Sequence, residues 1–218
     1  MQALIFDLNG TMIDDMSFHT IAWQDIFNND LKADFSLDQV KSNMYGKNSE
    51  VLERMFGLNY FTNEEITAIS EDKERRYQAA YRPSLRLLPG LPEFLEAAQK
   101  NNIPMAIASA AIPFNIDFVL DGLKIRNYFS AIVSANDVQF SKPHPETFLK
   151  AASLLGVSPL NCLVLEDAPK GAEAADKAGM QCAVLTTTHE KAEFSYLSNI
   201  TNFSVDYLDD YFVNLLNE

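Results

Sequence analysis

The sequence predicts an α/β protein in which a doubly wound parallel sheet carries one inserted, all-helical domain. A short apolar run over residues 3–6 ends in Asp7 and a glycine turn, as buried parallel strands do. Residues 15–84 contain helical patterns almost exclusively. From residue 85 onward, short apolar strands alternate with helices, which is typical of βαβ units. The expected domains are therefore a core of residues 1–14 and 85–218 and a helical domain of residues 15–84.

Capping signals define the helices of the inserted domain. Asp14-Asp15 is a good N-cap pair, and apolar residues follow it at helical spacing. The capping box Thr62-Asn63-Glu64-Glu65 opens a long, charged helix that continues to about Tyr81. Because the insertion directly follows the first strand's turn, we expect it to act as a lid over the carboxyl edge of the sheet. The expected helices cover residues 16–28, 36–42, 50–56 and 62–81.

The rest of the chain supplies the remaining strands and the helices that would cover both faces of the sheet. Apolar, β-branched runs bounded by turn residues predict the strands. Expected strands are residues 104–108, 131–134, 162–165, 181–185 and, as an edge strand, 203–205. Expected helices are residues 93–100, 114–123, a segment ending at 155, 171–179 and 207–216.

Composition limits the class of protein and its expected location. Of the 218 residues, 47% are apolar and 22% are charged, as in an ordinary soluble globular protein. No apolar run is longer than a strand, so no membrane span is expected, and Asp7 interrupts the apolar run that a secretory signal would need. We therefore expect a cytoplasmic protein. Cys162 and Cys182 fall in expected buried strands, which suits reduced, packed thiols.

The formal net charge of −13 bears on the partners. Nucleic acids and anionic membranes bind basic surfaces, so neither is expected to bind here. An anionic substrate would need a metal ion and a few local cations to hold it against this charge.

Polar residues follow successive strands of the expected sheet where each strand ends. The carboxyl ends of parallel strands meet at one edge, where open α/β sheets bind ligands. Carboxylates suit Mg²⁺, and a hydroxyl with an ammonium group suits a phosphoryl group. Each residue alone is a weak signal, because a strand-terminal serine or lysine usually belongs to a turn, but their joint occurrence is strong. The residues are Asp7, Ser109, Lys142, Glu166 and Asp167.

These residues carry a resemblance to the haloacid dehalogenase superfamily. Phe6-Asp7-Leu8-Asn9-Gly10-Thr11 resembles its first motif, in which a second aspartate stands two residues after the first. Ser109 resembles the second motif, Lys142-Pro143 the third, and Glu166-Asp167 with the Gly- and Ala-rich segment after it the fourth. The resemblance spans the whole chain and implies a Rossmann-like core. The helical insertion resembles the small cap domain of the branch that contains β-phosphoglucomutase and many small-molecule phosphatases.

The resemblance implies a role for each residue. Asp7 is the implied nucleophile, which forms an aspartyl-phosphate and so divides phosphoryl transfer into two displacements. Ser109, with the adjacent Ala110, and Lys142 would hold the phosphoryl oxygens. Mg²⁺ would bind the side chains of Asp7 and Asp167 and the backbone carbonyl of Asn9, with Glu166 as a ligand or directly behind one.

Asn9 departs from the family pattern. The family's second aspartate is the general acid and base, a role that an amide cannot fill. Three explanations remain open: another group supplies the proton, with His19 as the nearest candidate, Asn9 is an introduced substitution, or the protein binds a phosphorylated ligand with little turnover.

The helical domain departs as well. Members that resemble β-phosphoglucomutase carry a Gly-x-Ser/Thr-Arg turn, whereas this chain has Gly46-Lys47-Asn48-Ser49, in which Lys47 is a less directional cation than arginine. Lys73 and Tyr77 match positions that family members often use near the site, although Lys and Tyr on a helix surface are more often solvated.

These inferences favour a Mg²⁺-dependent phosphatase, a phosphoric monoester hydrolase that acts on a small phosphorylated metabolite, with sugar phosphates as the expected class. The alternatives are a hexose-phosphate mutase and a phospho-ligand-binding protein with little catalysis. A dehalogenase fits less well, because carbon–halogen displacement needs no metal site. The sequence leaves the substrate's identity and the oligomeric state open.

Overall fold

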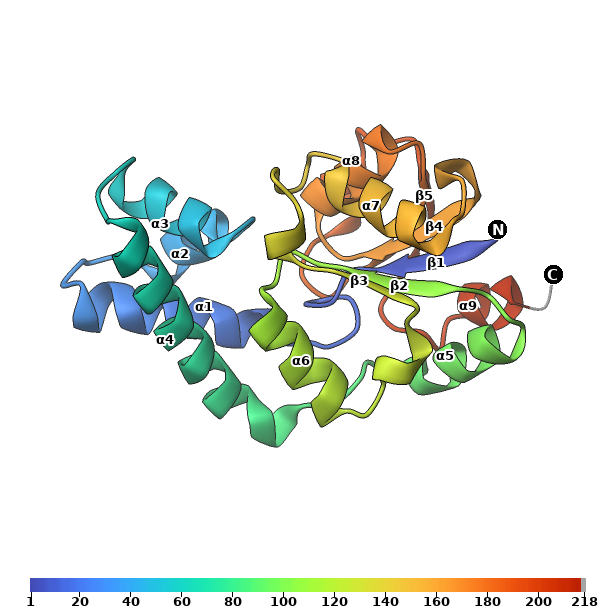
Figure 1. Cartoon of the computed structure of the whole chain (residues 1–218), viewed down its shortest axis with the longest axis horizontal. Helices are drawn as coiled ribbons and strands as arrows, with labels where there is room; N and C mark the ends of the chain where they lie inside the picture. The colour runs from blue at the N-terminus through green and yellow to red at the C-terminus, as the bar shows by residue number, and fades with distance from the viewer. Residues whose placement is uncertain (217–218) are drawn as a thin grey trace. The chain divides into compact units, whose positions relative to one another are not determined.

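The computed structural model describes residues 1–216, which form two compact units (Figure 1). The α/β unit comprises Met1–Asp14 and Arg86–Glu218, and the helical unit comprises Asp15–Leu85. The second boundary lies one residue later than expected. Leu85 remains with the helical unit because its amide donates to the carbonyl oxygen of Arg82, closing the last turn of that unit (3.4 Å).

The α/β unit is built on a six-stranded parallel sheet with the strand order β3-β2-β1-β4-β5-β6. This confirms the predicted fold class. Strand β1 lies between β2 and β4, so the order reverses at β1 and creates the switch point at which such sheets bind ligands. The strands are β1 (Ala3–Phe6), β2 (Met105–Ala108), β3 (Ala131–Val133), β4 (Cys162–Glu166), β5 (Gln181–Leu185) and β6 (Ile200–Ser204).

Helices cover both faces of this sheet. In Figure 1, α7 and α8 lie on one face, and α5 and α9 lie on the other. Successive residues of β1 serve the two faces, because Ile5 joins the core beneath α7 and α8 whereas the Phe6 ring packs against Phe94 of α5 (6.3 Å between centroids). The helices are α5 (Leu91–Lys100), α6 (Pro113–Gly122), α7 (Glu146–Leu155), α8 (Pro169–Lys177) and α9 (Asp210–Leu215).

Two elements near the end of the chain differ from expectation. The last helix begins at Asp210 rather than at residue 207, because the Tyr207 amide donates to the carbonyl oxygen of Pro89 and the Asp209 side chain caps the helix. The edge strand covers Ile200–Ser204 rather than residues 203–205. Its pairing with β5 ends at Ser204, and the following Val205 is exposed.

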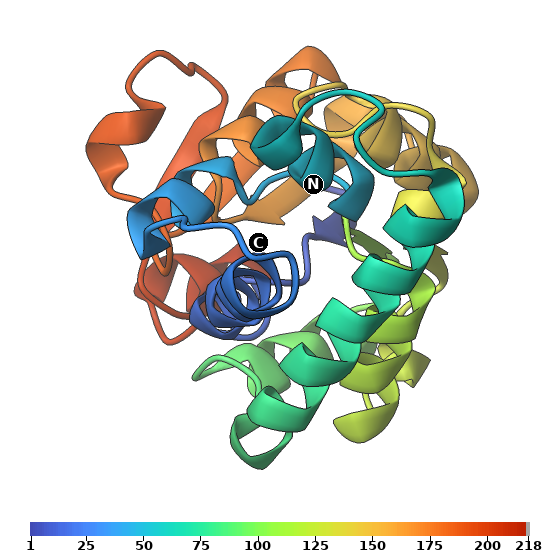
Figure 2. The ribbon, with the colours of Figure 1, turned by 90° about the vertical axis from the view of Figure 1, so that its left-hand side faces the viewer.

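The helical unit consists of α1 (Met16–Asp25), which continues as a π-helical turn (Ile26–Asp30), α2 (Leu37–Asn43), α3 (Asn48–Phe56) and α4 (Asn63–Tyr81). Figure 2 shows α1 nearly along its axis. The expected capping box is present, because Thr62 accepts from the Glu65 amide and Glu65 accepts from the Thr62 amide. Trp23 of α1 and Phe27 of the π-helical turn anchor a separate aromatic core, with their rings stacked at 5.0 Å.

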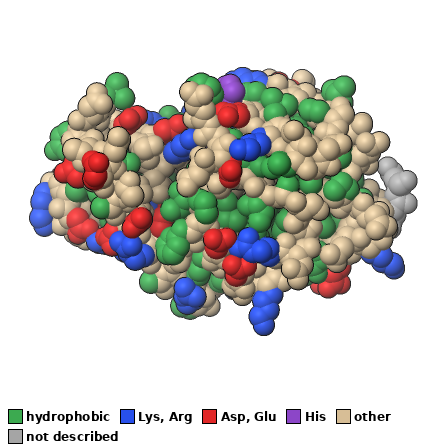
Figure 3. Space-filling model, viewed as in Figure 1, with side chains coloured by type: hydrophobic (Ala, Val, Ile, Leu, Met, Phe, Trp, Pro, Cys, Tyr) green, Lys and Arg blue, Asp and Glu red, His purple; other side chains and the backbone are tan. Residues whose placement is uncertain are grey.

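Charged side chains of both signs are scattered over the surface. On the face in Figure 3, Lys and Arg lie among Asp and Glu rather than gathering into one basic patch. In the part of the chain that the structure describes, no helix combines the length and the apolar character needed to cross a membrane.

Candidate active site

The strand ends bring the predicted residues to one edge of the sheet. Asp7 directly follows β1, and its amide donates to the carbonyl oxygen of Leu165 in β4 (2.9 Å). Glu166 is the last residue of β4, Ser109 follows β2, and Lys142 lies in the loop between β3 and α7. All the strands are parallel, so these positions share the carboxyl edge.

Lys142 joins two of the carboxylates. Its Nζ atom donates to Asp7 Oδ1 at 2.6 Å and to Glu166 Oε1 at 2.8 Å, and all three side chains are largely buried. The same ammonium group lies 4.6 Å from the centre of the Phe148 ring. Buried, charge-assisted hydrogen bonds of this length hold the lysine beside the nucleophile candidate.

The turn between β4 and α8 holds Glu166 in place. Its second oxygen, Oε2, accepts from the amides of Asp167 (2.7 Å) and Ala168 (2.8 Å). Gly171 makes room for this carboxylate, because a Cβ atom there would lie 1.7 Å from Glu166 Oε1. The glycine at position 171 of the predicted Gly- and Ala-rich segment is therefore needed to accommodate the Glu166 carboxylate.

Asp167 receives two hydroxyl groups. Thr11 Oγ1 donates to Asp167 Oδ1 at 3.0 Å, and Thr188 Oγ1 donates to Oδ2. Gly10 has a positive φ of 76°, and a Cβ atom at this residue would lie 2.3 Å from Asp167 Oδ2. Glycine at position 10 thus permits both the turn and the close approach of the carboxylate.

The electrostatics of this cluster are dominated by burial. Burial, supported by the Glu166 charge, raises the pKa of Asp7 to about 7 although Lys142 opposes the shift. Burial and the charges of Glu166 and Asp7 also raise the pKa of Asp167. The pKa of Lys142 is raised, because the attraction of Asp7 and Glu166 outweighs the effect of its burial.

The donor set fits a divalent cation. Asp7, Glu166 and Asp167 are three buried carboxylates, and Lys142 pairs with only the first two, so the ionised cluster carries excess negative charge. Within residues 1–216, however, no three His, Cys, Asp or Glu side chains converge on one point as a complete ligand set. Backbone, water or substrate oxygens must complete the site, which suits Mg²⁺, since it usually retains several waters.

The remaining predicted residues of this unit lie in two turns. Ser109 is buried, and its Oγ accepts from the amide of Ala111 (3.1 Å), which places Ala110 at the tip of the turn before α6. Asn9 is half-buried in the turn after β1, where the Gly10 amide donates to the carbonyl oxygen of Ile13 (2.8 Å).

In the helical unit, the structure brings two of the three predicted residues together. Lys73 Nζ lies 2.7 Å from His19 Nδ1. Lys and Tyr on a helix surface are usually solvated, but Lys73 and Tyr77 are buried. They face α1 and Trp23. Lys47 stands at the start of α3, where its amide donates to Glu50 Oε2 (2.9 Å).

The His19–Lys73 pair belongs to a buried polar cluster. Lys73 donates to both oxygens of Glu74 (3.0 and 3.1 Å), His19 Nε2 lies 3.3 Å from Asp15 Oδ2, and the Tyr77 hydroxyl donates to the same Asp15 oxygen. The Tyr77 ring stacks on His19 at 3.7 Å. Burial lowers the pKa of Lys73, and Glu74 opposes that shift.

Sequence reasoning missed several residues of these two clusters. Thr187 and Thr188 follow β5 at the same sheet edge, so the strand-end rule that found Ser109 could also have found them. Asp15 and Glu74 were visible in the sequence only as a helix cap and a surface charge, and no spacing rule indicates that they meet.

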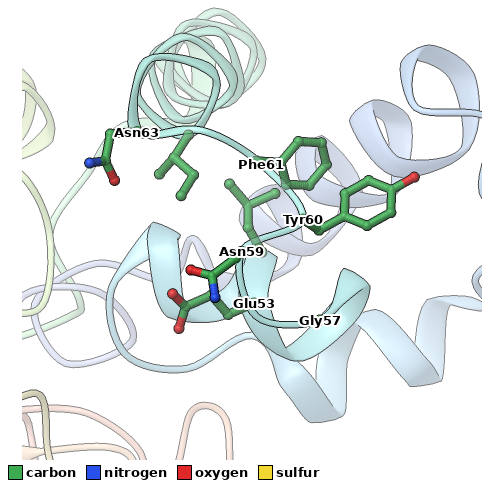
Figure 4. Close-up of a pocket in the computed structure, with 8 residues that line it drawn as sticks. Glu53, Gly57, Asn59, Tyr60, Phe61 and Asn63 are labelled. Atoms are coloured by element: carbon green, nitrogen blue, oxygen red, sulfur yellow. The ribbon is translucent and has the colours of Figure 1, made fainter.

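Two cavities lie away from this cluster. One of about 50 Å³ lies in the helical unit between the end of α3 and the start of α4, where Figure 4 shows Glu53 and Asn59 on one side of the loop. Another, of about 210 Å³, lies between α5 and residues 207–216. Neither cavity is lined by Asp7, Lys142 or Glu166.

Comparisons with known proteins agree with this geometry. A family profile described as haloacid dehalogenase-like hydrolase matches residues 1–179. An uncharacterised protein of Haemophilus influenzae is 37% identical over 182 residues, 82% of this chain and 88% of that protein. β-Phosphoglucomutase of Bacillus subtilis is 33% identical over 185 residues, 83% of this chain and 81% of that enzyme. Fructose-1-phosphate phosphatase YqaB of Escherichia coli is 30% identical over 182 residues, 81% and 92% of the two chains.

Solved structures show the same fold. A HAD hydrolase of family IA, variant 3, from Entamoeba histolytica superposes with a TM-score of 0.86 at 25% identity, covering 100% of both chains. β-Phosphoglucomutase of Clostridium difficile gives a TM-score of 0.83 at 26% identity, covering 99% of this chain and 96% of that one. The chain therefore belongs to the haloacid dehalogenase-like hydrolases, in the branch that includes β-phosphoglucomutase and small-molecule phosphatases.

Proposed function

We propose that this protein is a Mg²⁺-dependent phosphatase of a small phosphorylated metabolite, and that the reaction passes through an aspartyl-phosphate on Asp7. The observation that carries the proposal is the contact of Lys142 with both Asp7 and Glu166, next to Asp167. This cluster supplies a nucleophile, a cation for phosphoryl oxygens and carboxylates for a metal ion.

In the first step, an Asp7 oxygen attacks phosphorus while the bond from phosphorus to the leaving oxygen breaks. Asp7 must be ionised to attack, and its burial keeps the carboxylate poorly solvated and its pKa near 7. Lys142 lowers the repulsion between this carboxylate and the incoming phosphate dianion. Ser109 would donate its hydroxyl to a phosphoryl oxygen.

The metal ion would be held by the carboxylates of Asp7 and Asp167 and by the backbone carbonyl of Asn9, with Glu166 behind or beside them. When bound, Mg²⁺ supplies the positive charge that neutralises the phosphoryl oxygens. Gly10 and Gly171 leave room for the Asp167 and Glu166 carboxylates beside it.

In the second step, water attacks the aspartyl-phosphate and releases phosphate from Asp7. Neither this water nor the earlier leaving oxygen can exchange a proton with Asn9, since an amide is neither an acid nor a base at neutral pH. General acid–base help is worth about 10²–10⁴-fold, so both steps are expected to be slow. Slow hydrolysis would lengthen the life of the aspartyl-phosphate.

The relatives support a sugar phosphate as the substrate class. The Escherichia coli relative is named for fructose 1-phosphate, and a further relative there, 36% identical over 99 residues, is named hexitol phosphatase B. The partner we propose is accordingly a small phosphorylated metabolite, with no nucleic acid or membrane partner, and the proposed location is the cytoplasm.

Two other functions are each favoured by one observation. The similarity to β-phosphoglucomutase favours a hexose-phosphate mutase. Asn9 favours a phospho-ligand-binding protein with little turnover, because it replaces the family's acid–base group.

The test is a panel of sugar phosphates incubated with the wild-type protein, with and without Mg²⁺. We expect phosphate release that needs Mg²⁺, disappears in Asp7→Asn and persists in the control Asp14→Asn, whose side chain is exposed. Conversion of glucose 1-phosphate into glucose 6-phosphate, without free glucose, would favour the mutase. Calorimetric binding of sugar phosphates without any turnover would favour the binding protein.

A further inference from the structure

The loop after β5 contacts both the turn that follows Asp7 and the Asp167 carboxylate. It contains three consecutive threonines, Thr186, Thr187 and Thr188. The Thr187 hydroxyl donates to the carbonyl oxygen of Gly10, in the nucleophile's turn. The Thr188 hydroxyl donates to Asp167 Oδ2 and lies 3.2 Å from the Asp167 carbonyl oxygen. No part of the proposed reaction uses these hydroxyl groups directly.

Asp167 depends on such neutral donors more than its neighbours do. The carboxylate is 4% exposed, and within residues 1–216 no lysine, arginine or histidine forms an ion pair with it. Its side chain accepts from the hydroxyl of Thr11 on Oδ1 and from that of Thr188 on Oδ2. Each oxygen is therefore oriented by one hydroxyl group, whereas Asp7 and Glu166 are oriented by Lys142.

We propose that Thr188 is a positioning residue for the metal site, whose hydroxyl group holds Asp167 in the orientation that binds the divalent cation. This inference rests on the proposed function, because it takes Asp167 as a metal ligand. Thr188 would not touch the cation or the substrate, and it would act only through the Asp167 carboxylate.

The β5 loop would thus keep the Asp167 carboxylate oriented for metal binding. A buried carboxylate that loses one of two donors can rotate away from the direction in which it binds a cation. Loss of such an outer hydrogen bond typically weakens metal binding by about 10–100-fold. Thr187 would support the same geometry from the other side, because its bond to Gly10 fixes the glycine against which Asp167 packs.

The loop also contains a matched control. The Thr186 hydroxyl donates to the carbonyl oxygen of Ser204 in β6 (3.3 Å), away from the carboxylates. Thr186→Val and Thr188→Val make the same chemical change two residues apart. A difference between these variants therefore reports on the Asp167 contact rather than on the loop's general stability.

The experiment is a calorimetric titration of Mg²⁺ into the full, chelator-treated chain. We expect Thr188→Val to bind Mg²⁺ about 10–100-fold more weakly than the wild type, and Thr186→Val to bind as the wild type does. Thr188→Ser, which restores the hydroxyl, should bind at least about tenfold more tightly than Thr188→Ala. That second pair keeps the test decisive where the valine variant folds poorly.

Two negative results have different meanings. If the wild type and Thr188→Val bind Mg²⁺ equally, or if the Ser and Ala variants do, the role of Thr188 is overturned while the proposed function stands. If the wild type itself takes up no Mg²⁺, the metal site of the proposed function is wrong, and this inference is overturned with it.

Discussion

The two units of this protein each bury a cluster of charges, but they balance these charges differently. In the helical unit, Lys73 contacts both His19 and Glu74, and Asp15 accepts from the Tyr77 hydroxyl. Each carboxylate there has a hydrogen-bond donor within the cluster. In the α/β unit, the carboxylates of Asp7 and Glu166 share Lys142, and the third, Asp167, receives only hydroxyl groups and no ion pair among residues 1–216.

This difference indicates which cluster is structural and which is prepared for a ligand. Buried charges are costly unless they are paired and hydrogen-bonded, so a cluster in which each carboxylate receives a donor helps to hold a fold together. A cluster with an excess of one sign gains from an outside ion. The carboxylates of the α/β unit are thus suited to a divalent cation and a phosphoryl group, whereas the helical unit's cluster ties α1 to α4.

The largest expected change comes from adding a further carboxylate to the α/β cluster. Asn9→Asp supplies the missing acid and base, so the rate of phosphate release should rise by about 10²–10⁴-fold. The rate should also depend more steeply on Mg²⁺, because the cluster becomes more negative. Steady-state phosphate release over a range of Mg²⁺ concentrations measures both effects, and an unchanged or lower rate would contradict our account of position 9.

Removing the buried lysine of the helical unit's cluster should lower stability. Lys73→Met leaves Glu74 buried without its ammonium partner, which should lower the free energy of unfolding by about 3–5 kcal/mol. Urea denaturation measures this change. The control Arg75→Met breaks only exposed ion pairs on the same helix and should cost less than about 1 kcal/mol. Equal effects of the two substitutions would show that the cluster is not structural.

The buried carboxylate of Asp7 should make the metal-free α/β unit less stable at high pH. The folded-state pKa of Asp7 is about 7, above the ordinary value of about 4 for an aspartate, so between these two pH values the folded state holds a proton that the unfolded state has lost. The stabilisation is present below pH 4 and is lost as the pH rises through 7, by an amount on the order of 4 kcal/mol.

Comparison with Asp7→Asn isolates this effect. In chelator-treated protein, the difference in unfolding free energy between the wild type and Asp7→Asn should shift against the wild type between pH 4 and pH 8. Mg²⁺ should reduce the shift, because it stabilises the ionised carboxylate. A difference that stays constant with pH would show that the Asp7 carboxylate is not perturbed.

A smaller effect is expected from crowding Glu166. Gly171→Ala places a methyl group 1.7 Å from the present position of Glu166 Oε1, so the carboxylate must move and stability should fall by about 1–3 kcal/mol. Thermal denaturation with and without Mg²⁺ measures the loss, which should be accompanied by weaker Mg²⁺ stabilisation. The control Asp176→Ala changes an exposed residue of the same helix and should change neither the thermal stability nor the Mg²⁺ stabilisation.

Much of the α/β unit could be predicted from the sequence because its signals are local. Apolar strands, glycine turns and strand-end polar residues indicated the sheet and placed Asp7, Ser109, Lys142, Glu166 and Asp167 at one edge. The start of the last helix was not predictable, because it depends on the distant contact of Tyr207 with Pro89.

The helical unit's cluster could not be predicted in the same way. Lys73 and Tyr77 look like surface residues of a charged helix, and only the packing of α4 on α1 buries them. The Thr188 contact with Asp167 also joins two loops that follow different strands, and no sequence spacing encodes it.

The central claim is that the carboxylates of the α/β unit form a site for a divalent cation. The most direct test is a calorimetric titration of Mg²⁺ into chelator-treated wild type and Asp167→Asn, with Asp14→Asn as the control for loss of an exposed charge. We predict one binding event in the wild type and in Asp14→Asn, weakened by more than about 100-fold in Asp167→Asn. Absence of binding to the wild type, or equal affinity of Asp167→Asn, would contradict the claim.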